Sequence, residues 1–86
     1  MLTASANGIA HDNGRRCVEL RRMPDGRWII ATGVSILATG KSPWNPFTRD
    51  IFATADEARR TFLAALPDDA ALHDRARAAL RKLGAA

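Results

Sequence analysis

The sequence predicts an α+β domain, in which an antiparallel sheet of three or four strands is followed by two C-terminal helices packed on one face. Three features predict this class. Residues 16–32 alternate between apolar and polar types around a tight turn, a helix-capping sequence begins at Thr54, and a second helical pattern ends at Gly84. A chain of 86 residues has the length of one domain.

The first 14 residues are rich in turn signals. Asn7-Gly8 and Asp12-Asn13-Gly14 surround one short apolar patch, Ile9-Ala10. We therefore expect residues 1–14 to be a flexible lead-in with at most a brief edge strand. The single α+β domain is expected to occupy residues 15–86.

Residues 16–32 have the pattern of a β-hairpin. Val18 and Leu20 alternate with Glu19 and Arg21, which is the period of a half-buried strand. Pro24-Asp25-Gly26 supplies a tight turn, because proline presets φ and glycine accepts φ above zero. The segment from Trp28 to Thr32 is β-branched and aromatic and is expected to be the returning strand.

The chain between the hairpin and the first helix is harder to divide. The apolar run at residues 34–39 continues the second strand through a bulge at Gly33 or forms a strand of its own, and we favour one long, bent strand. Two prolines exclude regular structure from residues 40–47. A short strand is expected at residues 50–53.

Two helices follow. Thr54-Ala55-Asp56-Glu57 is a capping box, and Pro67 ends the helix that it starts. This helix is expected to face the sheet with Ala58, Phe62, Ala65 and Leu66. Asp68 can cap the second helix, and Gly84 suits the position after its end. The apolar seam of the second helix consists of Leu72, Ala76, Leu80 and Leu83.

Composition limits the cellular setting. The one cysteine, Cys17, cannot form a disulfide within the chain, which fits a reducing compartment. Residues 1–14 lack the basic start and apolar run of a signal peptide, and no stretch reaches the roughly 18 apolar residues of a membrane span. We expect a cytoplasmic, soluble protein without a membrane partner, either a monomer or a homodimer paired through the second helix.

The inventory of reactive side chains argues against an enzyme. His11 and His73 have no Cys or His neighbour at metal-ligand spacing, so no metal site is expected. Cys17 faces away from the Val18–Leu20 side and has no evident base. Gly40-Lys41-Ser42 ends like a phosphate-binding loop but lacks the earlier glycine and the following helix. We expect no catalytic residues and no cofactor.

A net charge of +4 favours acidic partners, nucleic acid first, although a coding bias toward Arg and Ala explains it equally well. Several cations lie on the predicted hairpin or beside the proline loop. On an open sheet face they would suit phosphates and base edges, whereas on an edge hairpin they would only keep the strand soluble. The candidate nucleic-acid contacts are Arg15, Arg16, Arg21, Arg27, Lys41 and Arg49.

The proline loop contains two large aromatic residues, Trp44 and Phe47. They either fold back over an open end of the core or form exposed anchors for a protein partner. The second alternative describes a protein-interaction module, such as an adaptor or a small inhibitor. Trp28, inside a strand, is expected to be core.

Two short motifs suggest a family. Gly26-Arg27-Trp28 and the segment Phe52-Ala53-Thr54-Ala55-Asp56-Glu57-Ala58 resemble the small three-stranded-sheet-plus-helix arm-binding domains at the N-terminus of phage integrases. The resemblance covers about residues 16–66. It implies that the sheet enters the DNA major groove and that Arg21, Arg27 and Lys41 contact DNA. The chain departs from that pattern in the loop at residues 43–47 and in its second helix.

Overall fold

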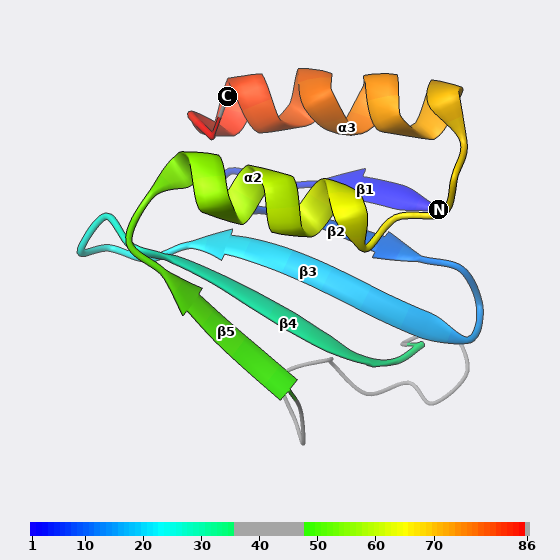
Figure 1. The fold of residues 1–86 in the computed structure, drawn as a ribbon, viewed down its shortest axis with the longest axis horizontal. Coiled ribbons are helices and arrows are strands. Elements are labelled where there is room, and N and C mark those ends of the chain that lie inside the picture. The colour runs from blue at the N-terminus through cyan, green and yellow to red at the C-terminus, as the bar shows by residue number, and fades with distance from the viewer. Residues whose placement is uncertain (36–47, 86) are drawn as a thin grey trace.

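The computed structural model describes residues 1–35 and 48–85, and these residues form a five-stranded antiparallel sheet and two helices (Figure 1). The sheet is a meander in which each strand pairs with the next along the chain. Its strands are β1 (Leu2–Ala4), β2 (Gly8–Asp12), β3 (Arg16–Arg22), β4 (Trp28–Val34) and β5 (Thr48–Phe52). The helices are α2 (Ala55–Ala64) and α3 (Ala70–Leu83). The α+β class and the antiparallel sheet are as predicted.

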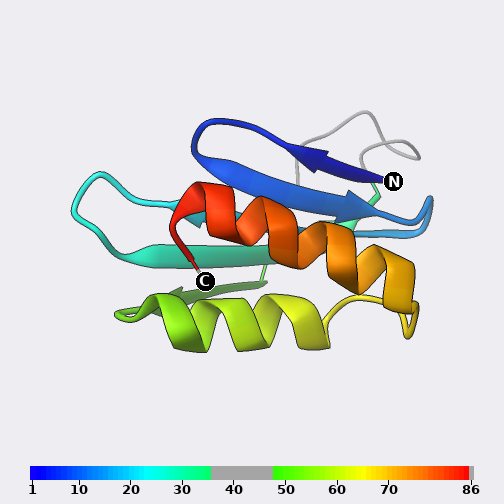
Figure 2. The ribbon, with the colours of Figure 1, turned by 90° about the horizontal axis from the view of Figure 1, so that it is seen from above.

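Both helices lie on the same face of the sheet (Figures 1 and 2). α2 packs mainly on β3, β4 and β5, whereas α3 packs on β1 and β2. The register places Ile9, Leu20 and Ile30 side by side on this face. Together with Phe62 of α2 and Leu80 of α3, they form the centre of the core, and each is at most 3% exposed.

The predicted hairpin is present. β3 and β4 pair from Arg16 opposite Val34 to Arg22 opposite Trp28, and Gly26 takes the left-handed conformation with φ 88°. Trp28 is 4% exposed and belongs to the core, as expected. β4 is described as far as Val34, and β5 begins at Thr48 rather than at residue 50. The extension predicted for residues 36–39 and the loop at 40–47 lie outside the described residues.

The predicted strand count is too low, because residues 1–14 contribute two strands instead of a flexible lead-in. The turn signals in this segment belong to the tight turns of a meander. Asp12 and Asn13 accept hydrogen bonds from the backbone amides of residues 14–16, which closes the β2–β3 turn. A Cβ atom on Gly8 would come within 2.7 Å of the Leu20 carbonyl oxygen. Only glycine therefore allows β2 to approach β3 so closely at this position.

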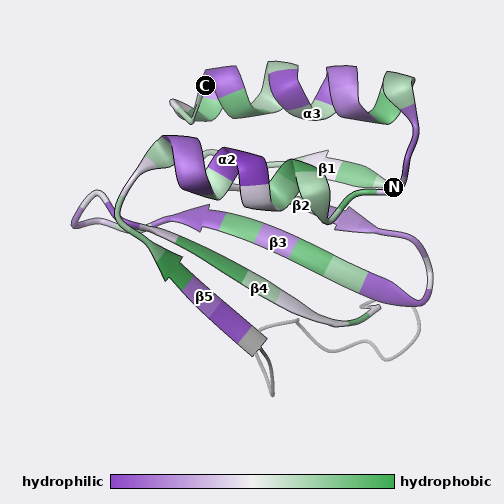
Figure 3. Cartoon of the chain, viewed as in Figure 1, coloured by the Kyte–Doolittle hydropathy of each residue, from purple (hydrophilic) through white to green (hydrophobic). Residues whose placement is uncertain are grey.

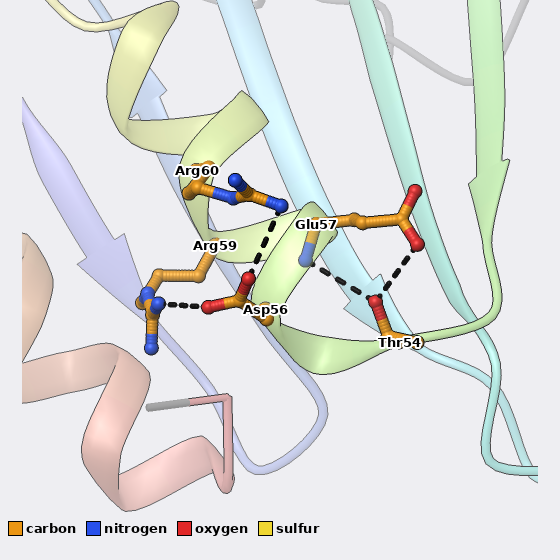
Figure 4. A network of polar contacts seen from close by, with 5 residues as sticks. All are labelled: Thr54, Asp56, Glu57, Arg59 and Arg60. Atoms are coloured by element: carbon orange, nitrogen blue, oxygen red, sulfur yellow. Dashed lines mark hydrogen bonds and ion pairs between the residues drawn. The ribbon is translucent and has the colours of Figure 1, made fainter.

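Both helices begin at a capping residue, and the cap of α3 lies one residue later than predicted. Thr54 accepts a hydrogen bond from the Glu57 amide at 3.3 Å and donates its hydroxyl to the Glu57 carboxylate at 3.0 Å (Figure 4). In α3 the cap is Asp69 rather than Asp68, since the Asp69 carboxylate accepts the Leu72 amide at 3.1 Å. Gly84 ends α3 in the left-handed conformation.

The apolar seam predicted for the second helix is buried along its whole length. On the first helix, Ala58 and Phe62 are buried, and Leu66 is buried just beyond its end. Ala65 is exposed, because α2 ends at Ala64 and Ala65 is its C-terminal cap. The two seams place both helices over the sheet and leave their charged sides outward.

Candidate functional site

The hairpin arginines lie at opposite ends of β3. Arg15 and Arg16 are at the β2–β3 turn, whereas Arg27 is in the β3–β4 turn. Because β3 has seven residues, these ends are about 20 Å apart at roughly 3.3 Å per residue. Arg21 lies near the Arg27 end. The predicted nucleic-acid contacts on the hairpin are therefore divided into two groups.

Two of these arginines are held by neighbouring carboxylates. Arg21 Nε lies 2.5 Å from Glu19 Oε1, and Arg27 Nε lies 2.7 Å from Asp25 Oδ2. Hydrogen bonds from the Arg27 backbone amide, and then from its side chain, lower the pKa of Asp25. Both pairs are exposed, so they add little stability, but each reduces the local positive charge that a phosphate would meet.

The remaining predicted contacts are scattered or outside the described residues. Arg49 is exposed on β5, opposite Ala31 of β4, and shares with Arg21 the sheet face away from the helices. Lys41 lies outside the described residues. So do Trp44 and Phe47, the predicted anchors for a protein partner, and their roles stay predictions.

The buried polar groups near the β2–β3 turn have structural partners. The Cys17 thiol is 1% exposed, and burial, followed by the nearby Asp12 and Glu19 charges, raises its pKa to about 11. Asp12 is also buried and accepts a hydrogen bond from the Ser35 hydroxyl at 2.5 Å. The thiol is therefore protonated at neutral pH and is not poised as a nucleophile.

The ionisable residues that the structure describes also form no evident metal centre. Within residues 1–35 and 48–85 no group of three or more His, Cys, Asp or Glu side chains could hold a metal ion. Burial and the N-terminal ammonium lower the pKa of His11, and the Asp12 charge opposes this shift. His73 Nε2 donates a hydrogen bond to the Pro67 carbonyl oxygen at 3.0 Å, close to the start of α3.

A feature that sequence reasoning missed is a groove between β1 and α3. It has a volume of about 460 Å³, and on one side it is lined by Ala4, Ser5 and Ala6. The α3 side consists of Arg75, Ala78, Ala79, Lys82 and Leu83. We call it the β1–α3 groove. The alanine and leucine residues make the lining mainly apolar, and the two cations lie seven residues apart on one side of the helix.

The outer edge of β1 offers backbone hydrogen-bonding groups beside this groove. Met1 and Asp12 bond to each other in both directions, and the Ser5 amide donates to the Gly8 carbonyl. Paired residues alternate between bonded and non-bonded positions in an antiparallel ladder, so Thr3 bonds to Ala10 while Leu2 and Ala4 do not bond to β2. The amides and carbonyls of Leu2 and Ala4 therefore point outward, and no described strand pairs with them.

The two cations of the groove have no acidic partner within the described part of the chain. Among the described residues, no carboxylate lies within ion-pairing distance of Arg75 or Lys82. By contrast, Arg77 on the same helix lies 3.4 Å from Asp74. Figure 3 shows the hydrophilic residues of α3 on the side away from the sheet and its apolar residues toward it. The groove thus has a mainly apolar lining and two positive charges that no carboxylate of the described residues pairs with.

A second hollow, about 760 Å³ in volume, lies on the face away from the helices. Its lining includes Asn7, Glu19, Arg21 and Pro24. Glu19 and Arg21 pair with each other there, and Arg22 in the same lining adds one positive charge, against two from Arg75 and Lys82 in the β1–α3 groove. It offers less to a charged partner than the β1–α3 groove does.

Comparison of the chain with protein-family models, curated proteins and solved structures finds no match. Across the part of the chain that the structure describes, no helix has the length and apolar composition needed to cross a membrane.

Proposed function

We propose that the chain is a small non-catalytic binding module that takes up an extended segment of a protein partner at the β1 edge of its sheet. The observation that carries this proposal is the row of outward backbone groups at Leu2 and Ala4, of which Ala4 also lines the β1–α3 groove. An edge of this kind is a template for another strand.

The groove supports this function because its side chains provide selectivity between peptides, which backbone pairing alone does not. Main-chain hydrogen bonds bind any extended peptide, whereas pockets for alternate side chains distinguish one peptide from another. The wall formed by Ala78 and Ala79 of α3 lies beside the position that an added strand would occupy. The groove therefore provides selectivity beside the edge of β1, whose backbone groups can pair with any extended peptide.

The arrangement of the sheet favours a protein segment over insertion into DNA. Five strands spaced about 4.8 Å apart give a face about 19 Å wide. The DNA major groove is about 12 Å wide and admits a helix or a two-stranded ribbon. The docking implied by the integrase resemblance therefore suits this wider sheet poorly.

Nucleic-acid binding is retained as a second candidate because of Arg15 and Arg16. Both are exposed at the β2–β3 turn, and neither has a carboxylate partner among the described residues. They are free to contact phosphates without breaking an ion pair. Binding of this kind weakens steeply with salt, by orders of magnitude between about 50 and 200 mM.

Titrations with peptides and with nucleic acids test the two candidate functions. Labelled extended peptides of about ten residues, with alternating apolar and polar positions, are added to the full chain up to about 1 mM, and fluorescence anisotropy is measured. We expect binding that is lost in Ala4→Pro, which removes an outward amide, and retained in Ala4→Ser, which keeps it. Absence of peptide binding, or equal binding by Ala4→Pro, contradicts the proposal. Parallel titrations with labelled DNA and RNA at the two salt concentrations test the second candidate.

A further inference from the structure

From the charges and spacing of the β1–α3 groove we infer that its occupant is an acidic extended segment, which adds to the sheet as a sixth strand outside β1. Its carboxylates bind Arg75 and Lys82, and an apolar side chain between them packs against Ala78 and Ala79. This inference rests on the proposed function and names the chemical class of the partner.

The geometry of β1 directs half of the partner's side chains toward α3. Leu2 and Ala4 are opposite His11 and Ile9, and Ile9 belongs to the core on the helix-covered face. Leu2 and Ala4 therefore share that face, and a strand beside them continues the same row. α3 runs roughly parallel to β1 on this face and contacts both β1 and β2 (Figures 1 and 2), so every second side chain of the added strand points to the side of the sheet that carries the helix.

The spacing of the two cations fits the period of a strand. Arg75 and Lys82 are seven residues apart on α3, which is about 10.5 Å along the helix axis. In a strand, residues i and i+4 share a face and lie about 13 Å apart, with residue i+2 between them. The long side chains of Arg and Lys cover the difference of about 2.5 Å. The expected pattern is acidic residue, any residue, apolar residue, any residue, acidic residue.

Charge complementarity favours an acidic segment over a second copy of the chain. β1 consists of Leu2, Thr3 and Ala4 and offers no carboxylate to the cations of a partner copy. Each copy also has a net charge of +4, so pairing along β1 would bring like charges together. An acidic segment would pair its carboxylates with Arg75 and Lys82. Its backbone would form hydrogen bonds with the outward amides and carbonyls of β1.

The test uses two blocked peptides with the cores Glu-Thr-Val-Thr-Glu and Gln-Thr-Val-Thr-Gln, titrated into the full chain. We expect the acidic peptide to bind about tenfold more tightly at low salt, because each of its two carboxylates gains an exposed ion pair. The advantage should shrink to about twofold near 0.5 M salt, where charges are screened within a few ångström.

Matched variants locate the effect. The pair Arg75→Gln and Lys82→Gln is expected to remove the preference for the acidic peptide. The pair Arg77→Gln and Arg81→Gln makes the same change in net charge on the same helix outside the groove, and it is expected to keep the preference. Thermal unfolding of both double variants checks that each is folded, and neutral glutamine avoids placing a new negative charge near the C-terminal end of α3.

Each outcome decides the inference. Equal binding of the two peptides, with loss in Ala4→Pro, overturns the acidic partner and leaves the edge-strand function standing. No binding of either peptide overturns both. An equal loss of preference in the Arg77/Arg81 control overturns the groove as the site. Concentration-dependent dimerisation that Ala4→Pro abolishes, measured by sedimentation, identifies a second copy as the occupant instead.

Discussion

Arg22 illustrates how packing decides the role of a single basic residue. It belongs to the basic stretch of the hairpin, yet its guanidinium carbon lies 5.8 Å from the centre of the Trp28 ring. Its Nη1 is also 3.5 Å from the position that a Cβ atom on Gly84 would occupy, beside the C-terminal end of α3. A cation over an aromatic face and near a helix C-terminus stabilises the fold. Arg22 therefore covers the core edge and is less available to a partner than its sequence position suggests.

His11 makes stability depend on pH. Its pKa lies below the ordinary value of 6.5, chiefly because the ring is buried. The unfolded chain therefore binds a proton more readily than the folded chain between the lowered pKa and 6.5, and stability falls as pH decreases through that window. We expect the free energy of unfolding to fall more between about pH 7.5 and pH 5 in the wild type than in His11→Gln. Urea unfolding at the two pH values measures this, and identical losses would contradict the assignment.

At the scale of elements, the sequence predicted correctly those elements whose formation depends on residues close together in the chain. The hairpin at residues 16–32 and the box at Thr54 depend on neighbouring residues, and both are present. The start of α3 was misplaced by one residue, since adjacent aspartates have the same capping chemistry. The backbone decides between them, because Asp69 has the extended φ of −140° and ψ of 109° that a cap requires.

The cap assignment predicts unequal effects from two adjacent aspartates. Asp69→Ala should lower the free energy of unfolding by about 1 kcal/mol, because the Leu72 amide loses its acceptor. Asp68→Ala removes the same charge next to the same helix without breaking that bond, and should change stability by no more than about 0.5 kcal/mol. Chemical denaturation of both variants compares them. A larger effect at Asp68 would show that the sequence-based assignment was right.

β1 and β2 were missed because their stability comes from partners distant in sequence. Ile9 is the one large apolar residue of β2, and β1 has three residues, so neither shows the alternation that identifies a strand. The β1–α3 groove could not be predicted for the same reason. Its walls, residues 4–6 and residues 75–83, come together only when β1 joins the sheet under α3. In the sequence, Arg75 and Lys82 are two of several charged residues of α3, and no local pattern distinguishes them from the others.

At the scale of the whole molecule, the N-terminal hairpin is part of the core. Ile9 is 2% exposed and lies opposite Leu20, which is fully buried. α3 packs on β1 and β2, so removal of this hairpin would expose the apolar seam of α3. A domain of 86 residues has a thin core and a stability of only about 5–10 kcal/mol, so it depends on each buried strand.

The same substitution at two isoleucines tests this organisation. Ile9→Ala should destabilise the fold by about 3 kcal/mol, because it leaves a cavity between the sheet and the helices. Ile51 on β5 is 59% exposed, and Ile51→Ala should cost less than about 1 kcal/mol. Urea denaturation of both variants gives the comparison. Equal costs would mean that residues 1–14 do not contribute to the core.

Amide hydrogen exchange can show whether the outer edge of β1 is open and receives a strand. In the chain alone, the Leu2 and Ala4 amides should exchange rapidly, whereas the Thr3 amide, bonded to β2, is protected. Saturation with the Glu-Thr-Val-Thr-Glu peptide should slow exchange at Leu2 and Ala4 by about tenfold or more and change Thr3 much less. Unchanged exchange at Leu2 and Ala4 in the complex, or strong protection of both in the chain alone, would contradict the claim.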